Sequence, residues 1–187
     1  MTVPEIRPAT FADLDPLVEL MDELRQAMAA INPAAEVLDP ATLRKYARGY
    51  LTGPGNLVLL ALDGGGPVGF LRANVRLGEL TAPLPGQRLP WREALRRRIN
   101  QWRGRKPGPP VIYIAELSVR PGHRRQGLAR ALLAEAEAAL AFAGAETAYL
   151  RALADNDEGL AFWQSAGFRG ETVFMVKRKK SSPAGDR

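Results

Sequence analysis

The alternation of hydrophobic and polar positions divides the chain into an early helical part and a series of strands. Between Thr10 and Met28, apolar residues recur every three or four positions, at Leu14, Leu17, Val18, Met21 and Leu24. This spacing predicts a helix with one buried face. Thr10 and Asp13 resemble a capping box that begins this helix, and a second helix is expected after Asp39 and Pro40, with proline at a favoured first position.

Apolar runs that are bounded by turn residues predict the strands. A short strand is expected at residues 4–8, and a hairpin around 63–67 between strands at 57–62 and 69–76. Further strands are expected at 111–119, 147–153 and 168–177. A long helix to about Phe142, stopped by Gly144, separates the first two, and a short helix at 158–165, capped by Asp157 or Asn156, precedes the last.

The chain of 187 residues is long enough for one domain with a substantial core, which we expect to cover residues 1–178. Residues 80–110 differ from their surroundings, because proline and glycine bound them and Trp91 to Trp102 combines helical spacing with an arginine cluster. We interpret this segment as a basic loop insertion, with a lid or a partner-binding element as the alternative. The polar tail at 179–187 is expected to be disordered.

The net charge of +6 comes from three local runs of basic residues. Residues 88–106 carry eight basic side chains against a single acid, residues 177–187 carry five against one, and residues 120–130 contain four arginines and no acid. The rest of the chain is therefore acidic on balance. This distribution disfavours a general nucleic-acid-binding surface.

The chain contains no cysteine and a single histidine, His123. This composition excludes disulfides, a thiol nucleophile and a zinc site built from cysteine or histidine, and we expect no bound metal. Residues 1–8 lack the layout of a signal peptide, and no apolar run approaches membrane-spanning length. The expectation is a cytoplasmic protein without a membrane partner.

The glycine-rich run at residues 64–69 matches the dinucleotide-binding fingerprint G-x-G-x-x-G. That fingerprint requires a helix to follow, because the pyrophosphate binds at the helix N-terminus. The residues that follow here predict a strand. We therefore interpret the run as a hairpin turn.

A different stretch has the features of a phosphate-binding turn. An apolar strand ends at Val119, the basic residues 120–126 follow, and Gly127 opens an alanine-rich helix. A helix N-terminus presents backbone N–H groups to an anion, and glycine allows the anion to approach closely. The pattern Arg124-x-x-Gly127-x-Ala129 resembles the pyrophosphate-binding signature of the GNAT superfamily of acyl-CoA-dependent N-acyltransferases.

A second block extends the resemblance. Asn156 and the run from Phe162 to Phe168 lie where that family carries an asparagine, a short helix, a tyrosine and Gly-Phe. The resemblance implies an α/β (α+β) fold with a mixed, mostly antiparallel central sheet that is splayed at the middle strands and has helices on both faces. It also implies transfer of an acetyl or other acyl group from acetyl-CoA to a primary amine by direct attack, without a covalent enzyme intermediate.

The resemblance also assigns the residues that would bind coenzyme A as co-substrate. The amides of residues 126–130 would cradle the pyrophosphate, and Arg124 and Arg125 would add charge-assisted bonds. The backbone of Val119 would pair with the pantetheine arm and polarise the thioester carbonyl. The expected cofactor-binding residues are Leu117, Val119, Arg124, Arg125, Gln126, Gly127, Leu128, Ala129, Arg130, Asn156 and Trp163.

Glu116 is the candidate general base, because an acid inside an apolar strand normally requires a purpose. Alternation predicts that Glu116 shares a face of the strand with Ile112 and Ile114, opposite Leu117 and Val119. The family often has an acid at about this position, directed to the acceptor amine. The alternative is a buried carboxylate that satisfies backbone or arginine groups. His123, among the arginines of the turn, is interpreted as a loop-filling residue or a weak phosphate contact.

The general acid is where the chain departs from the family pattern. Trp163 occupies the position of the family's usual tyrosine, and an indole N–H cannot protonate a departing thiolate near neutral pH. Tyr149 is the candidate acid, with Tyr113, Ser165 or water as alternatives. Trp163 is expected to pack on the pantetheine arm.

Two other functions stay open at this stage. A non-catalytic acyl-CoA-binding regulatory module would tolerate Trp163, and a nucleic-acid or acidic-partner binder would use residues 88–106 and the tail. The enzyme is the preferred interpretation. Its acceptor, a small-molecule or protein amine, is not specified by the motifs, although the acidic remainder of the chain favours a cationic amine. A homodimer is left open.

Overall fold

The computed structural model describes residues 5–32, 38–77, 80–82, 110–141 and 144–171. Strand β1 (Glu5–Pro8) precedes helices α1 (Leu14–Ile31) and α2 (Pro40–Thr52). Strands β2 (Asn56–Asp63), β3 (Gly66–Leu77), β4 (Leu80–Ala82) and β5 (Pro110–Val119) follow. The described part ends with α4 (Leu128–Ala141), β6 (Thr147–Leu150) and α5 (Asp157–Ser165). Most of the basic insertion, residues 172–177 of the last expected strand and the tail lie outside the described residues.

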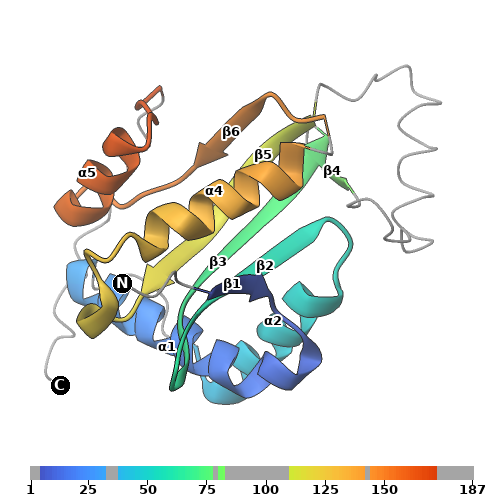
Figure 1. The fold of residues 1–187 in the computed structure, drawn as a ribbon, viewed down its shortest axis with the longest axis vertical. Helices are drawn as coiled ribbons and strands as arrows, with labels where there is room; N and C mark the ends of the chain where they lie inside the picture. Colours follow the sequence, from blue (N-terminus) through green and yellow to red (C-terminus); the bar gives the residue numbers. More distant parts are fainter. Residues whose placement is uncertain (1–4, 33–37, 78–79, 83–109, 142–143, 172–187) are drawn as a thin grey trace, which may run out of the picture.

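The strands form one mixed sheet in the order β1-β2-β3-β5-β6, with β4 paired to β3 (Figure 1). Every described pair is antiparallel except β5 with β6, which is parallel. The glycine-rich run lies in the hairpin between β2 and β3, as predicted, and a strand rather than a helix follows it. The predicted fold class is therefore confirmed.

Helices cover both faces of the sheet (Figure 1). Helices α1 and α2 pack on one face through the buried residues Leu14, Leu17, Leu20, Met21, Leu43, Ala47, Val58, Leu60 and Phe70. Helix α4 packs on the other face through Leu59, Ala61, Val68, Leu71, Ala73, Val75, Ile112, Ile114, Val119, Leu128, Leu132, Leu133 and Ala136. Successive residues of β2 and β3 alternate between these clusters because side chains along a strand point to opposite faces. We call the two sides the α1/α2 face and the α4 face.

The predicted capping box at Thr10 and Asp13 is present, but it begins a 3-10 turn (Phe11–Asp13) that leads into α1. Asp13 accepts the backbone N–H of Thr10 at 2.8 Å and both terminal nitrogens of Arg7 at 2.8 and 2.7 Å. The Arg7 guanidinium holds the pKa of the Asp13 carboxyl well below its usual range, against the opposing effect of burial. Since Arg7 lies in β1, this cluster fastens the start of α1 to the edge of the sheet.

A bulge in β5 overturns the predicted alternation around Glu116. The pairing with β3 shifts between Glu116 and Ile114, so Ala115 is an extra residue on the β5 side. Ile112 and Ile114 lie in the core of the α4 face, whereas Glu116 contacts Arg25 of α1 on the opposite face. The prediction that Glu116 shares a face with the two isoleucines is wrong, because one inserted residue inverts the alternation.

Strand β5 pairs with β6 over only part of its length. Residues Val111–Ile114 pair with Thr147–Leu150, and β6 ends there, before the predicted residue 153. Within the described residues, no strand lies against the β6 side of β5 from residue 115 onward. The sheet is thus splayed between β5 and β6.

None of the described helices is both long and apolar enough to cross a membrane.

Candidate functional site

The open edge of β5 consists of backbone groups between Ala115 and Val119. The Arg120 N–H donates to Val68 O at 2.9 Å across the ladder with β3. Hydrogen-bonded and non-hydrogen-bonded residues alternate along an antiparallel ladder. The preceding residue, Val119, therefore directs its N–H and C=O away from β3, and so does Leu117 two positions earlier. These groups face the side from which β6 has diverged. Such an edge can pair with an extended ligand that carries amide groups.

The turn between β5 and α4 presents backbone amides at a helix N-terminus. A 3-10 turn (Pro121–His123) follows β5, and Arg125 and Gly127 then adopt positive φ values of 63° and 82°. The first helical hydrogen bond runs from the Ala131 N–H to Gly127 O, at 2.9 Å. The amides of residues 128–130 therefore have no acceptor inside the helix. A Cβ built on Gly127 would meet no atom within 4 Å, so the space beside it is open.

Two arginines of this region connect the turn and α4 to α5. Arg124 donates through Nε to Val119 O at 3.0 Å and through Nη1 to Glu158 Oε2 at 3.2 Å. Arg130 donates through Nη2 to the backbone and side-chain oxygens of Ser165, at 3.4 and 3.3 Å. These contacts dock α5 beside the turn between β5 and α4. They also show that Arg124, expected at a phosphate, bonds protein oxygens in this structure.

Arg125 and Gln126 form the outer part of the turn. The exposed Arg125 side chain makes no hydrogen bond or ion pair with any other described residue. Gln126 donates through Nε2 to Gly122 O at 3.4 Å. A guanidinium without a protein partner, next to open amides, is suited to a phosphate group because charge-assisted hydrogen bonds are stronger than neutral ones.

Asn156 is the N-cap of α5. Its Oδ1 accepts the Gly159 N–H at 3.1 Å, and a Cβ built on Gly159 would lie 2.5 Å from Asn156 Nδ2. A side chain at position 159 would therefore require the Asn156 amide to shift from this position. Of the two predicted caps, Asn156 and Asp157, the structure selects Asn156. A role of Asn156 toward coenzyme A stays a prediction.

Trp163 belongs to an aromatic cluster at the end of α5. Its ring lies edge to face with Phe162, at 4.9 Å between centroids, and with Phe168, at 5.4 Å. All three rings pack against the core of the α4 face. Packing of this kind accounts for an indole at this position, since a large apolar ring fills the space between α5 and the sheet. Contact with the pantetheine arm stays a prediction.

Two arginines hold Glu116 on the α1/α2 face. Arg72 Nε donates to Glu116 Oε2 at 2.9 Å, and Arg25 Nη2 lies 3.7 Å from Oε1, beyond hydrogen-bond distance. The Arg72 guanidinium also stacks on Tyr50 of α2, 4.0 Å from the ring centroid. Burial, and then the charge of Glu116, raise the pKa of the Tyr50 hydroxyl, which is therefore neutral at pH 7. Oε1 of Glu116 keeps lone pairs that no described donor occupies.

A second polar cluster lies further along β3 on the same face. Arg76 donates through Nε to Asn74 Oδ1 and through Nη1 to the Tyr149 hydroxyl, both at 3.1 Å. Its guanidinium stacks on Tyr113 at 4.0 Å, and the rings of Tyr113 and Tyr149 lie 4.9 Å apart. The structure thus brings two of the candidate acids together. Ser165 lies elsewhere, in the contact between α4 and α5.

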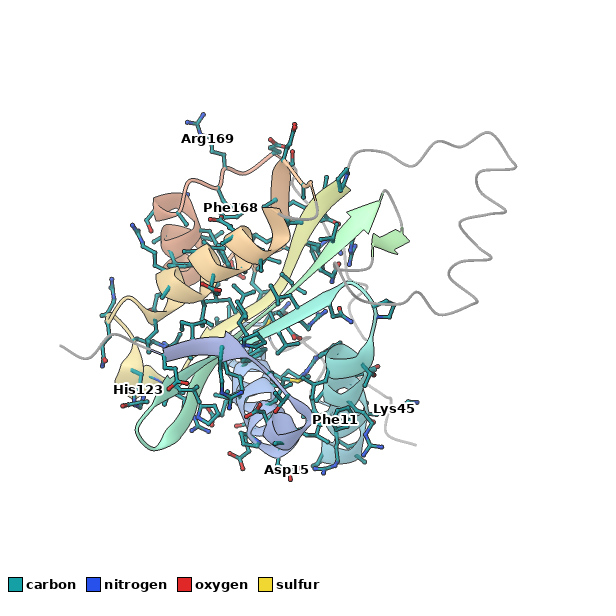
Figure 2. All side chains as sticks on the ribbon, turned by 45° about the vertical axis from the view of Figure 1, so that its right-hand side comes forward. Phe11, Asp15, Lys45, His123, Phe168 and Arg169 are labelled. Carbon is teal, nitrogen blue, oxygen red and sulfur yellow. The ribbon has the colours of Figure 1, made fainter. Side chains whose placement is uncertain are left out.

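His123 connects the turn between β5 and α4 to the hairpin between β2 and β3. Figure 2 shows its side chain beside that hairpin, where His123 Nε2 lies 3.1 Å from Asp63 Oδ2. Nδ1 of His123 is buried and has no hydrogen-bond partner among the described residues. These contacts fit the loop-filling interpretation of this histidine.

Three arginines of the α1/α2 face were not predicted as site residues, namely Arg25, Arg72 and Arg76. A signal for two of them is present, because Arg72 and Arg76 interrupt an apolar strand at an even spacing that places both on one face. Arg25 gives no such signal. Its approach to Glu116 depends on how α1 packs on the sheet.

A family profile matches most of the chain. The profile of the acetyltransferase (GNAT) family covers residues 18–168, which include the splayed strands, the turn before α4 and the α5 block. The chain belongs to the GNAT acetyltransferase family. No curated protein matches its sequence. In the described part of this GNAT protein, no group of three or more acidic or histidine side chains is placed to hold a metal ion.

Solved structures share the fold over almost the whole chain. The BH1408 protein from Bacillus halodurans, solved as a tetramutant, has a TM-score of 0.69 and 16% identity, covering 94% of this chain and 99% of that one. Aminoglycoside 6'-N-acetyltransferase AAC(6')-IG from Acinetobacter haemolyticus has a TM-score of 0.65 and 22% identity, with coverages of 95% and 99%. Aminoglycoside N-acetyltransferase AAC(6')-Iy, solved with CoA, has a TM-score of 0.66 and 16% identity, with 97% of each chain covered. At these identities the likeness establishes the fold.

Proposed function

We propose that this protein transfers an acetyl group from acetyl-CoA to a primary amine, by direct attack of the amine nitrogen on the thioester carbonyl. One observation carries the proposal, together with the family. The unpaired edge of β5 ends at the turn that leads into α4, whose first amides are open. An extended ligand with a pyrophosphate at one end would be held along this whole path.

The described residues fit coenzyme A. The amides of residues 126–130 and the Arg125 guanidinium supply donors for the pyrophosphate, and Gly127 leaves room for it. The backbones of Leu117 and Val119 supply an edge for the amide groups of the pantetheine arm. Arg124 now bonds Val119 O, so it would exchange this carbonyl for a phosphate oxygen when the arm pairs there. Once bound, acetyl-CoA supplies the acyl group and a thiolate leaving group.

Glu116 is the proposed base for the acceptor amine. Arg72 fixes Oε2 at 2.9 Å, which leaves Oε1 to accept a proton of the amine, directly or through water. As the nitrogen–carbon bond forms, the carbon–sulfur bond breaks, and the amine proton passes to Glu116 or to water. The Val119 N–H faces the open edge and would polarise the carbonyl oxygen.

Tyr149 is the proposed acid for the thiolate, with solvent as the other proton source. Arg76 donates to the Tyr149 oxygen, so the hydroxyl keeps its own proton for donation. The side chain is 37% exposed, which leaves it accessible to a bound substrate. Trp163, packed between two phenylalanine rings, has no titratable proton to contribute near neutral pH.

A turnover assay tests the proposal. Purified protein is incubated with acetyl-CoA and a panel of amino acids, peptides, polyamines and an aminoglycoside, and thiol release is followed together with the mass of the amine. We expect thiol release that depends on one class of amine, with that amine gaining an acetyl group. Binding of acetyl-CoA without acetylation of any amine contradicts the proposal and favours a regulatory module.

A further inference from the structure

We infer that the amine acceptor also carries a carboxylate group, an inference that rests on the proposed function. It follows from the charges around Glu116. Among the described residues of the α1/α2 face, Arg25 and Arg72 share one carboxylate, that of Glu116, and Arg76 contacts none. The face that we assign to the acceptor is therefore positively charged on balance.

Arg76 carries the charge that the described residues do not neutralise. Its contacts are with the Asn74 amide oxygen, the Tyr149 hydroxyl and the Tyr113 ring, all of which are uncharged partners. A guanidinium stays charged at any working pH and presents five N–H donors in one plane. Only Nε and one Nη1 hydrogen are engaged, so the remaining donors match a carboxylate.

The acidic side chains of α1 do not neutralise these arginines. Each described carboxylate of this helix has another partner: Glu19 and Glu23 lie 3.6 and 2.8 Å from Arg120, Asp15 pairs with Arg44, and Asp22 accepts from Gln26. Helix α2 contains no acidic residue. Within the described residues, Glu116 is the only carboxylate that contacts Arg25 or Arg72.

The strand register sets the separation of the two groups on the acceptor. Glu116 pairs with Arg72, whereas the Arg76 guanidinium leans back over Asn74 and Tyr113, a pair that lies two β3 residues further on. Two strand residues span about 6–7 Å. An amine at Glu116 and a carboxylate at Arg76 are therefore separated by several bonds, as in an ω-amino acid or a dipeptide.

A polycationic acceptor is disfavoured by the same charges. The additional ammonium groups of such a molecule would lie against Arg25 and Arg76, and like charges at a binding surface cost free energy. This inference reverses the expectation of a cationic amine, which rested on the acidic balance of the whole chain. The charges close to the bound acceptor determine which acceptor is preferred, because electrostatic interactions weaken with distance and are screened by salt.

Matched pairs of acceptors test the inference. We would measure kcat/KM for a five- or six-carbon ω-amino acid and a dipeptide, each against its amide, with wild type, Arg76→Gln and Arg76→Lys. We expect wild type to prefer each carboxylate over its amide by about tenfold, as for one charge-assisted hydrogen bond. Arg76→Gln should lose this preference, and Arg76→Lys should keep part of it. Arg44→Gln is the control, because it removes a guanidinium that pairs with Asp15 on the exposed side of α2.

Equal kcat/KM for the carboxylates and the amides in wild type overturns the inference, as does a preference that survives in Arg76→Gln. If Arg76→Gln does not fold, the wild-type comparison decides alone. If only polyamines or the acceptors with an amidated carboxyl group are acetylated, this inference is overturned and the proposed function stands. No acetylation of any amine overturns both.

Discussion

Gly127 combines a φ of 82° with open space where a Cβ would project. An L side chain in this conformation costs roughly 1–2 kcal/mol, and its Cβ would occupy the open space that we assign to the pyrophosphate. We predict that Gly127→Ala stays folded and loses about tenfold in coenzyme A affinity, equivalent to about 1.4 kcal/mol. Isothermal titration calorimetry measures this loss.

Gly144 offers a matched control at the other end of α4. It has a φ of 73°, and a Cβ there would also meet no atom within 4 Å. Gly144→Ala should therefore lose similar stability in thermal unfolding and keep its coenzyme A affinity. If both variants lose affinity equally, or if neither does, the cradle is not at Gly127.

Glu116 is tested by the pH dependence of Glu116→Gln. We expect turnover to fall by roughly 10²-fold near neutral pH, because the amine loses its proton acceptor. The loss should shrink at alkaline pH, where free amine becomes abundant. Rates of thiol release at saturating acetyl-CoA measure this profile. A loss of equal size at every pH would make Glu116 a positioning residue that orients the amine.

Single residues differ in how far their sequence reveals their role. Gly127 and Asn156 lie at the helix starts of their own segments, so local patterns predicted both helix starts, with Asp157 as the other candidate for the second cap. The face and partners of Glu116 were not predictable, because they depend on an extra residue, Ala115, and on the packing of α1. Neither feature leaves a periodic signal in the sequence.

The start of α1 depends on Asp13, which connects Thr10 of the cap to Arg7 of β1. We predict that Asp13→Asn lowers the free energy of unfolding at pH 7 by about 1 kcal/mol, since a charge-assisted pair is broken whose arginine is partly exposed to solvent. The pKa of the Asp13 carboxyl is depressed in the folded state. Its contribution is therefore complete above the unfolded pKa of about 4 and is lost as pH falls below that value.

Urea unfolding between pH 7 and pH 2 measures this dependence. Wild type should lose more stability on acidification than Asp13→Asn, so the two curves should converge at low pH. Asp39→Asn serves as control, because Asp39 is an exposed cap of α2 and asparagine caps equally well. A constant difference between wild type and Asp13→Asn at all pH values would contradict the assigned ion pair.

Helices and strands with a regular spacing of apolar residues were predictable as elements, but their first and last residues were less predictable. The helices and the β2–β3 hairpin follow from spacing and turn residues. Strand β6 ends at Leu150, three residues before the predicted end. Its apolar pattern continues, but β5 diverges from it after Ile114, so hydrogen bonding stops before the pattern does.

In the molecule as a whole, the two substrates would approach β5 from different sides. The donor path follows the unpaired edge of β5 from the α4 turn, whereas Glu116 and its arginines lie on the α1/α2 face. The bulge at Ala115 brings the donor path and Glu116 together. It places the Glu116 side chain on the α1/α2 face, close to the point of β5 where β6 diverges. The splay of the sheet and the bulge together create the place where donor and acceptor would meet.

Hydrogen–deuterium exchange with and without coenzyme A tests this arrangement most directly. We predict slower exchange in the bound state for the amides of Leu117, Val119 and residues 126–130, with no change in β1 or α2. Protection of these amides would place the ligand along the β5 edge and the start of α4. Unchanged exchange at residues 126–130 under saturating coenzyme A, or protection confined to other segments, would contradict the proposed donor site.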